Sequence, residues 1–188
     1  MSPFPISTRN TLLLATLLAL CVPLTACKRS LDEAEVLAFI DKADAAARKR
    51  YALEICELRG ETFSLQLTFQ ADETNRGPSD LTMDRKLFCK EAGKFSRLQY
   101  QLERKSLDIE VASDRKTARV NKHYVETMPY YDLDIMPATP DDFRKFQIVE
   151  SYEEARVGIE GGELVFLSSD TDSTQTLVDK YSLSIPYN

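Results

Sequence analysis

The sequence predicts an α+β fold in which two to three N-terminal helices pack on a curved antiparallel sheet. Two patterns lead to this prediction. Up to about residue 92, most apolar residues recur every three or four positions, which is typical of amphipathic helices. After Gly93, apolar and polar residues alternate in long runs, which is typical of strands. Helices that precede a run of strands usually collect on one face of an antiparallel sheet.

The first expected helix covers residues 31–50. Ser30 and Glu33 have the spacing of a capping box, in which a hydroxyl and a carboxylate satisfy the first free N–H groups of a helix. Apolar side chains then recur at helical spacing: Leu37, Ile40, Ala43, Ala47 and Tyr51.

Two shorter helices are expected after it. The second covers residues 52–58 and is ended by Gly60, because glycine favours the backbone conformation that closes a helix. The third covers residues 83–92, with Thr82 as its cap and Gly93 at its end.

The remaining elements are expected to be strands and turns. Phe63–Phe69 alternates strictly, and residues 72–80 contain the Asn, Gly and Pro of a loop. Turns are expected at Ser113–Arg115 and Gly161–Gly162. The later strands are expected around residues 98–102, 107–111, 118–125, 147–159 and 164–168.

The N-terminal segment has the features of a signal peptide. Arg9 precedes an apolar run over residues 11–26, and Leu24–Cys27 resembles the lipobox of bacterial lipoproteins. Sixteen helical residues span only about 24 Å, less than a membrane-spanning helix needs. The resemblance implies that Cys27 is lipidated, and Lys28 after it implies sorting to the outer membrane, facing the periplasm. The alternatives are an ordinary signal peptide cut after residue 26 and a short membrane anchor.

We therefore expect a signal peptide over residues 1–26, a lipidated tether over 27–30 and a single domain over 31–188. The formal net charge of the whole chain is −6. An acidic chain argues against nucleic acid as a partner, because phosphate backbones attract basic surfaces. The expected partners are the membrane, through the lipid anchor, and another protein.

Cys56 and Cys89 are the two cysteines that follow the lipobox. Because the periplasm is oxidising, we expect them to form a disulfide bond. Two free thiols or a redox pair are the alternatives, although the CxxC spacing of common redox pairs is missing from the sequence.

The order of the predicted elements resembles that of the nuclear transport factor 2-like (NTF2-like, or SnoaL-like) cone fold. The stretches that carry the resemblance are 35–43 and 50–56 for the first helices, and 113–120 and 157–166 for two hairpins. The resemblance covers about residues 31–169. It implies a helix-lined cone, and enzymes of this fold place Asp or His side chains inside it. The candidates for such a pocket are Tyr100, His123 and Tyr124, with an outward-facing His123 as the alternative.

The segment Met128–Pro140 contains three prolines, two adjacent tyrosines and two methionines. Tyrosine and methionine are enriched at interface cores, and proline lowers the entropy cost of ordering a loop. We therefore expect Tyr130, Tyr131, Ile135 and Met136 to contact a partner. The alternative is a loop that closes the core.

The sequence contains no common catalytic motif, and no metal or cofactor is expected. The predicted function is that of a lipid-anchored periplasmic binding protein without catalytic activity. Immunity proteins and envelope-accessory lipoproteins are examples of this class. The alternative is a cone that binds a small apolar ligand or acts as an enzyme.

Overall fold

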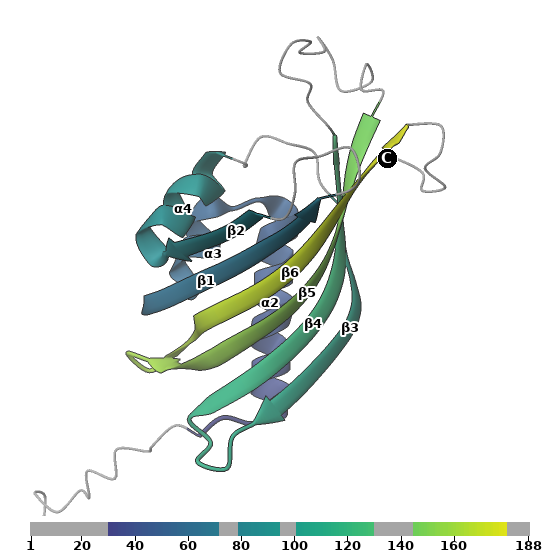
Figure 1. Cartoon of the computed structure of the whole chain (residues 1–188). Helices are drawn as coiled ribbons and strands as arrows, with labels where there is room; N and C mark the ends of the chain where they lie inside the picture. Colours follow the sequence, from purple (N-terminus) through teal and green to yellow (C-terminus); the bar gives the residue numbers. More distant parts are fainter. Residues whose placement is uncertain (1–29, 72–78, 95–100, 130–144, 180–188) are drawn as a thin grey trace, which may run out of the picture.

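The computed structural model describes residues 30–71, 79–94, 101–129 and 145–179 (Figure 1). In this part of the chain the helices are α2 (Glu33–Lys49), α3 (Ala52–Glu57) and α4 (Arg85–Lys94). The strands are β1 (Arg59–Ala71), β2 (Ser79–Asp84), β3 (Gln101–Val111), β4 (Thr117–Pro129), β5 (Lys145–Glu160) and β6 (Glu163–Asp179).

The strands form one six-stranded sheet in the order β2-β1-β6-β5-β4-β3. All neighbours pair antiparallel except β1 and β6, which are parallel. The predicted α+β class is confirmed. The sheet is mixed and not purely antiparallel, because β1 lies beside β6 and runs parallel to it. The long strands curve, and α2 lies across one face of the sheet (Figure 1).

Helix α2 covers the sheet with an apolar side. Val36, Phe39 and Ile40 are buried against Val120 of β4 and Val157 of β5. The spacing of the apolar residues predicted this helix. The side chain of Asp32 caps its first turn.

The cap of α2 differs from the prediction. The Glu35 N–H donates to the Asp32 carboxylate over 2.8 Å, so Asp32, not Ser30, caps the helix. Asp32 directly precedes the first helical residue, Glu33, so its short side chain reaches back to the free N–H groups.

The sequence did not predict strand β2. Leu81 pairs with Leu67 of β1, and Met83 pairs with Leu65, in the region predicted as a loop and a helix start. The predicted cap Thr82 is therefore wrong. Asp84 caps α4 instead, because its carboxylate accepts the Leu87 N–H over 2.8 Å.

Both predicted hairpin turns are confirmed. Gly161 and Gly162 have positive φ angles of 60° and 88° and connect β5 to β6, as a two-residue turn requires. At the β3–β4 turn, the Asp114 carboxylate accepts the Lys116 N–H over 2.9 Å.

The chain enters the domain at the same turn. The Leu31 N–H donates to the Arg115 carbonyl over 2.8 Å, and the Leu31 side chain is fully buried.

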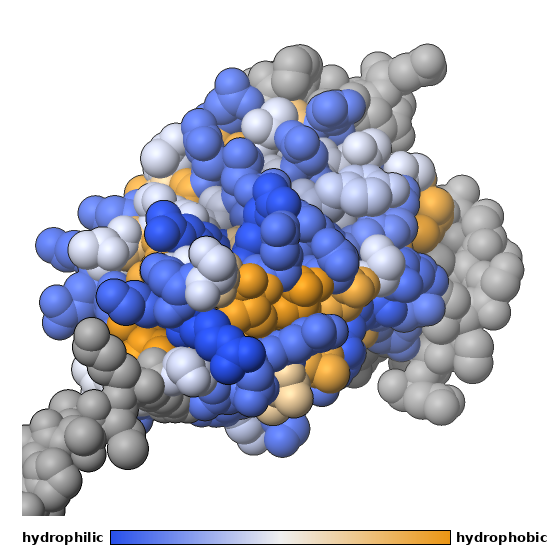
Figure 2. Space-filling model, turned by 90° about the horizontal axis from the view of Figure 1, so that it is seen from below, coloured by the Kyte–Doolittle hydropathy of each residue, from blue (hydrophilic) through white to orange (hydrophobic). Residues whose placement is uncertain are grey.

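Seen from below, this side of the molecule is mostly hydrophilic, with a band of hydrophobic surface across it (Figure 2). Among the described residues no helix is both long and apolar enough to cross a membrane.

Candidate functional site

The side chains of strand β4 point alternately to the two faces of the sheet, and both faces carry polar groups. Val120, Lys122 and Tyr124 alternate on the face that α2 covers, because Val120 lies in the helix-packed core and strand side chains alternate. His123 therefore faces the opposite, outer side of the sheet. The structure does not bring His123 and Tyr124 together in one pocket.

A network of charged side chains lies on the helix-covered face, beside the apolar core. The Lys122 Nζ lies 3.0 Å from the Glu153 carboxylate on β5 and 3.3 Å from the Asp44 carboxylate on α2. Arg104 of β3 binds the other oxygen of Asp44 at 3.1 Å and also Asp41 at 2.8 Å. Asp44 is only 2% exposed, so its pairs with Lys122 and Arg104 tie α2 to the sheet at a buried carboxylate, whereas Asp41 is exposed.

The network holds its charges in place. Burial alone would raise the pKa of Glu153, but Lys122, the Ser169 hydroxyl and Arg59 together keep this pKa below its usual value. Burial alone would lower the pKa of Lys122, but Glu153 and Asp44 outweigh burial and raise it. Glu153 and Lys122 therefore remain charged over a wide range around neutral pH.

Hydroxyl groups line the interior beside this network. The Ser169 hydroxyl donates to Glu153 over 2.6 Å, and the hydroxyls of Ser151 and Ser173 lie 2.8 Å apart. Burial raises the pKa of the Tyr124 phenol well above its usual value, with further contributions from the charges of Glu153 and Glu126. Tyr124 thus stays neutral in the interior.

Arg59, the first residue of β1, lies among the rings of Phe63, Phe88 and Phe166, a cluster that we call the aromatic corner. The centre of its guanidinium lies 5.2, 4.8 and 4.3 Å from the ring centroids of Phe63, Phe88 and Phe166. Burial lowers the pKa of Arg59 to about 10, although Glu153 opposes this shift. The buried Arg59 Nε has no hydrogen-bond acceptor among the described residues.

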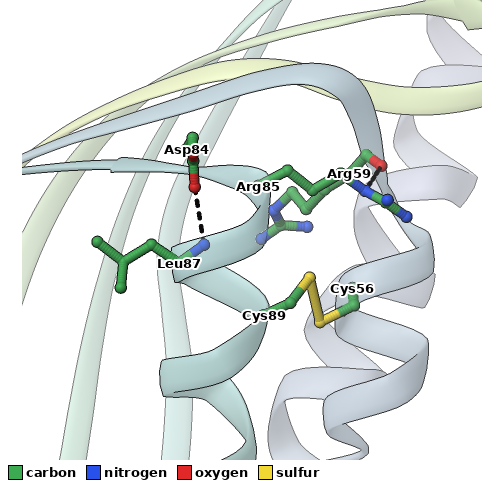
Figure 3. Close-up of a disulfide and its surroundings, with 6 residues drawn as sticks. All are labelled: Cys56, Arg59, Asp84, Arg85, Leu87 and Cys89. Carbon is green, nitrogen blue, oxygen red and sulfur yellow. Dashed lines mark hydrogen bonds between the residues drawn. A yellow bond between two sulfur atoms is a disulfide. The ribbon is translucent and has the colours of Figure 1, made fainter.

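A disulfide lies beside this corner (Figure 3). Cys56 of α3 and Cys89 of α4 are joined, with their Cα atoms 5.4 Å apart, as predicted. The Arg85 Nε donates to the Arg59 carbonyl over 2.9 Å, so the start of α4 is also fastened to the start of β1.

The outer face of the sheet carries two hollows. The smaller, of about 490 Å³, is lined by residues that include Asp108, Asn121, His123 and Tyr152. The larger, of about 790 Å³, continues across β4, β5, β6 and β1. Most of the residues that line the two hollows carry polar side chains on the side of the sheet away from α2.

An aromatic pair lies in the smaller hollow. The rings of His123 and Tyr152 stack with centroids 4.3 Å apart and planes at 11°. The Glu150 carboxylate lies 2.8 Å from the His123 Nε2 and accepts the Tyr152 hydroxyl over 3.3 Å. One carboxylate oxygen of Glu150 therefore contacts the polar atoms of both rings and helps to fix their orientation.

The other predicted site residues lie outside the described part of the chain: Cys27, Tyr100, Tyr130, Tyr131, Ile135 and Met136. Sequence analysis missed the interior network of Lys122, Glu153 and Asp44. The signal that could have found it is spacing, since Lys122 follows the core residue Val120 by two positions, as Glu153 precedes Ala155. Within the described ranges, no three His, Cys, Asp or Glu side chains gather as metal ligands.

No family model matches this chain, and no curated protein is similar enough to it to show a relationship. Several solved structures are similar. A putative scytalone dehydratase from Novosphingobium aromaticivorans has a TM-score of 0.56 at 12% identity, covering 77% of this chain and 85% of that chain. A conserved protein from Planctomyces limnophilus has a TM-score of 0.55 at 11% identity, covering 77% and 98%.

A third structure is a LinA-type3 hexachlorocyclohexane dehydrochlorinase from Novosphingobium barchaimii. Its TM-score is 0.56 at 6% identity, covering 82% of this chain and 94% of that chain. At such low identity the similarity shows the fold alone. The chain therefore has the NTF2-like α+β fold, as the order of its predicted elements indicated.

Proposed function

We propose that this chain is a non-catalytic binding protein that holds another protein, anchored by lipid on Cys27 to the outer membrane and facing the periplasm. The observation that carries the proposal is the closed ion-pair network around Lys122 and Glu153. If these side chains were the general acid and base of an enzyme, they would have to exchange protons with a substrate.

General acids and bases work best when their pKa lies near the working pH. The pKa values of Glu153 and Lys122 are displaced away from neutrality in opposite directions. Each charge is also already bound by the other, by Asp44 or by a hydroxyl. The arrangement stabilises the packing of α2 on the sheet and leaves little proton-transfer capacity.

The position of the tether supports a role at a surface. Cys27 precedes Leu31 by four residues, which reach at most about 14 Å, and Leu31 is fixed to the β3–β4 turn. A lipid on Cys27 would keep that turn close to the membrane.

The predicted contact segment starts at the other end of the sheet. Strand β4 has 13 residues from Thr117, at the anchored end, to Pro129. At about 3.4 Å per residue, it carries Pro129 roughly 40 Å away. Pro129 pairs with Phe146 of β5 at the end of the sheet opposite the β3–β4 turn, and the predicted contact residues Tyr130 and Tyr131 follow Pro129 directly in the sequence.

A second candidate function is a small-ligand or enzymatic pocket inside the cone. Two similar structures bear the names of a dehydratase and a dehydrochlorinase. The aromatic corner around Arg59, whose Nε is buried without a described acceptor, is the feature of this chain that favours it. Turnover that is lost in Arg59→Met while the fold is retained would favour this alternative.

The binding proposal is tested by photo-crosslinking in the cells that produce the protein. A benzoylphenylalanine in place of Ile135 should give one discrete protein adduct. Tyr130→Ala combined with Tyr131→Ala should abolish the adduct while the thermal midpoint changes little. The same crosslinker in place of Lys49, exposed at the end of α2, is the control. Equal adducts from both positions, or none from Ile135, would contradict the proposal.

A further inference from the structure

We propose that the outer face of the sheet around Tyr152 binds a basic segment of a partner protein, with an Arg or Lys side chain placed against the Tyr152 ring. This inference rests on the proposed binding function and adds the chemistry of the partner. The face concerned is the one turned to the viewer in Figure 1, with α2 behind the sheet.

The two hollows on this face form a continuous site. Glu154 of β5 and Asp170 of β6 line both of them. Volumes of about 490 and 790 Å³ lie in the range of pockets that hold small ligands. A peptide segment could place one side chain in the smaller hollow and continue along the larger one.

Tyr152 provides a rigid platform in the smaller hollow. The residue is 58% exposed, although one side of its ring is stacked on His123. The Glu150 carboxylate holds the Tyr152 hydroxyl and the His123 ring. A ring that is already fixed loses little conformational entropy when a cation stacks on its free side, and guanidinium groups favour tyrosine faces.

The charge of the face is complementary to a cation. Asp170 and Asp172 form no ion pair within 4 Å with any described residue, and Asp108 also lines the smaller hollow. The guanidinium of Arg119 is bound to Glu110. The carboxylates that line the two hollows from this face outnumber its guanidinium groups. They are Asp108, Glu110, Glu154, Asp170 and Asp172, against Arg119 and Arg156.

A basic protein segment fits this face better than a second copy of the chain. Two copies packed face to face would bring the same carboxylates against each other, which is unfavourable. The net charge of −6 would also speed the approach of a basic partner at low salt.

The test uses the full chain, purified in detergent, and a fluorescent octapeptide with four arginines alternating with glycines. The matched probe replaces each arginine with citrulline, which keeps the shape and removes the charge. We expect saturable binding of the arginine peptide that weakens as salt rises, and at least tenfold weaker binding of the citrulline peptide. Tyr152→Ala should weaken binding about fivefold. Asp170→Asn combined with Asp172→Asn should weaken it by a similar factor.

The control is Glu57→Gln, which removes one negative charge at the exposed end of α3. This variant should bind the arginine peptide as the wild type does. Equal binding of the two peptides would overturn the proposal, as would equal losses in Glu57→Gln and the Asp170/Asp172 variant. So would wild-type self-association that Tyr152→Ala abolishes. If the Ile135 crosslink forms while the arginine peptide does not bind, the proposal that the face around Tyr152 binds a basic segment is wrong, and the proposed binding function stands.

Discussion

The ammonium nitrogen of Lys122 lies 3.0 Å from a carboxylate oxygen of Glu153, its direct partner on the neighbouring strand, under the cover of α2. Both side chains are only 11% exposed. Removing two charges from water is costly, and the mutual attraction and further hydrogen bonds offset that cost. Asp44 and Ser169 supply those further bonds.

Lys122→Met is expected to lower the free energy of unfolding by about 3–5 kcal/mol, because it leaves Glu153 buried without its cation. The measurement is urea unfolding followed by circular dichroism. Lys122→Met combined with Glu153→Gln should recover part of the loss, since neither charge then remains unpaired. A double variant as unstable as the sum of the two single variants would contradict the coupling.

The same pair makes stability depend on acid. Folding lowers the pKa of Glu153, so the unfolded chain takes up its proton at a higher pH than the folded chain. The stabilisation is therefore present above the ordinary carboxyl pKa of about 4.5 and is lost as the pH falls through the lower, folded value.

Wild-type protein should thus lose more unfolding free energy between pH 7 and about pH 3 than Glu153→Gln does. Urea midpoints at both pH values measure the difference. Parallel losses in the two proteins would show that other carboxylates cause the acid sensitivity.

The sequence predicted the elements that local pattern controls. Helix α2 was expected because its apolar residues repeat, and the Gly161–Gly162 turn because few other residues adopt positive φ angles. Strand β2 was missed because its six residues lie directly before the helix signal of α4. Its pairing with β1 is a tertiary contact that local propensity does not report.

The polar interior was missed for a related reason. A charged residue in a strand of alternating polar and apolar residues is usually predicted to face solvent. Only oppositely charged partners on other elements allow it to be buried, and the local sequence does not reveal these partners. The partner of Lys122 on α2, Asp44, lies 78 positions away in the sequence. Whether His123 or Tyr124 faced inward also required the strand register, which the sequence left open.

Cys27→Ala is expected to move the protein from the membrane fraction to the soluble periplasm or to stall its processing, because it removes the lipid attachment point. Fractionation and intact mass measure the change. Cys21→Ala is the matched control, since Cys21 belongs to the expected leader and should not matter. A wild type without lipid mass that fractionates like the variant would show that the lipobox assignment is wrong.

Cys56→Ala is expected to lower the free energy of unfolding by about 2–4 kcal/mol. The bond joins residues 33 positions apart and fastens α3 to α4, next to the aromatic corner of Arg59. Its loss enlarges the conformational entropy of the unfolded chain and removes the covalent link between the two short helices. Denaturant unfolding with and without reductant measures the effect. Reduced wild type should be as unstable as Cys56→Ala, and reductant should leave the variant unchanged. If unfolded, unreduced wild type exposes both Cys56 and Cys89 to thiol labelling, the bond is not formed and the expectation fails.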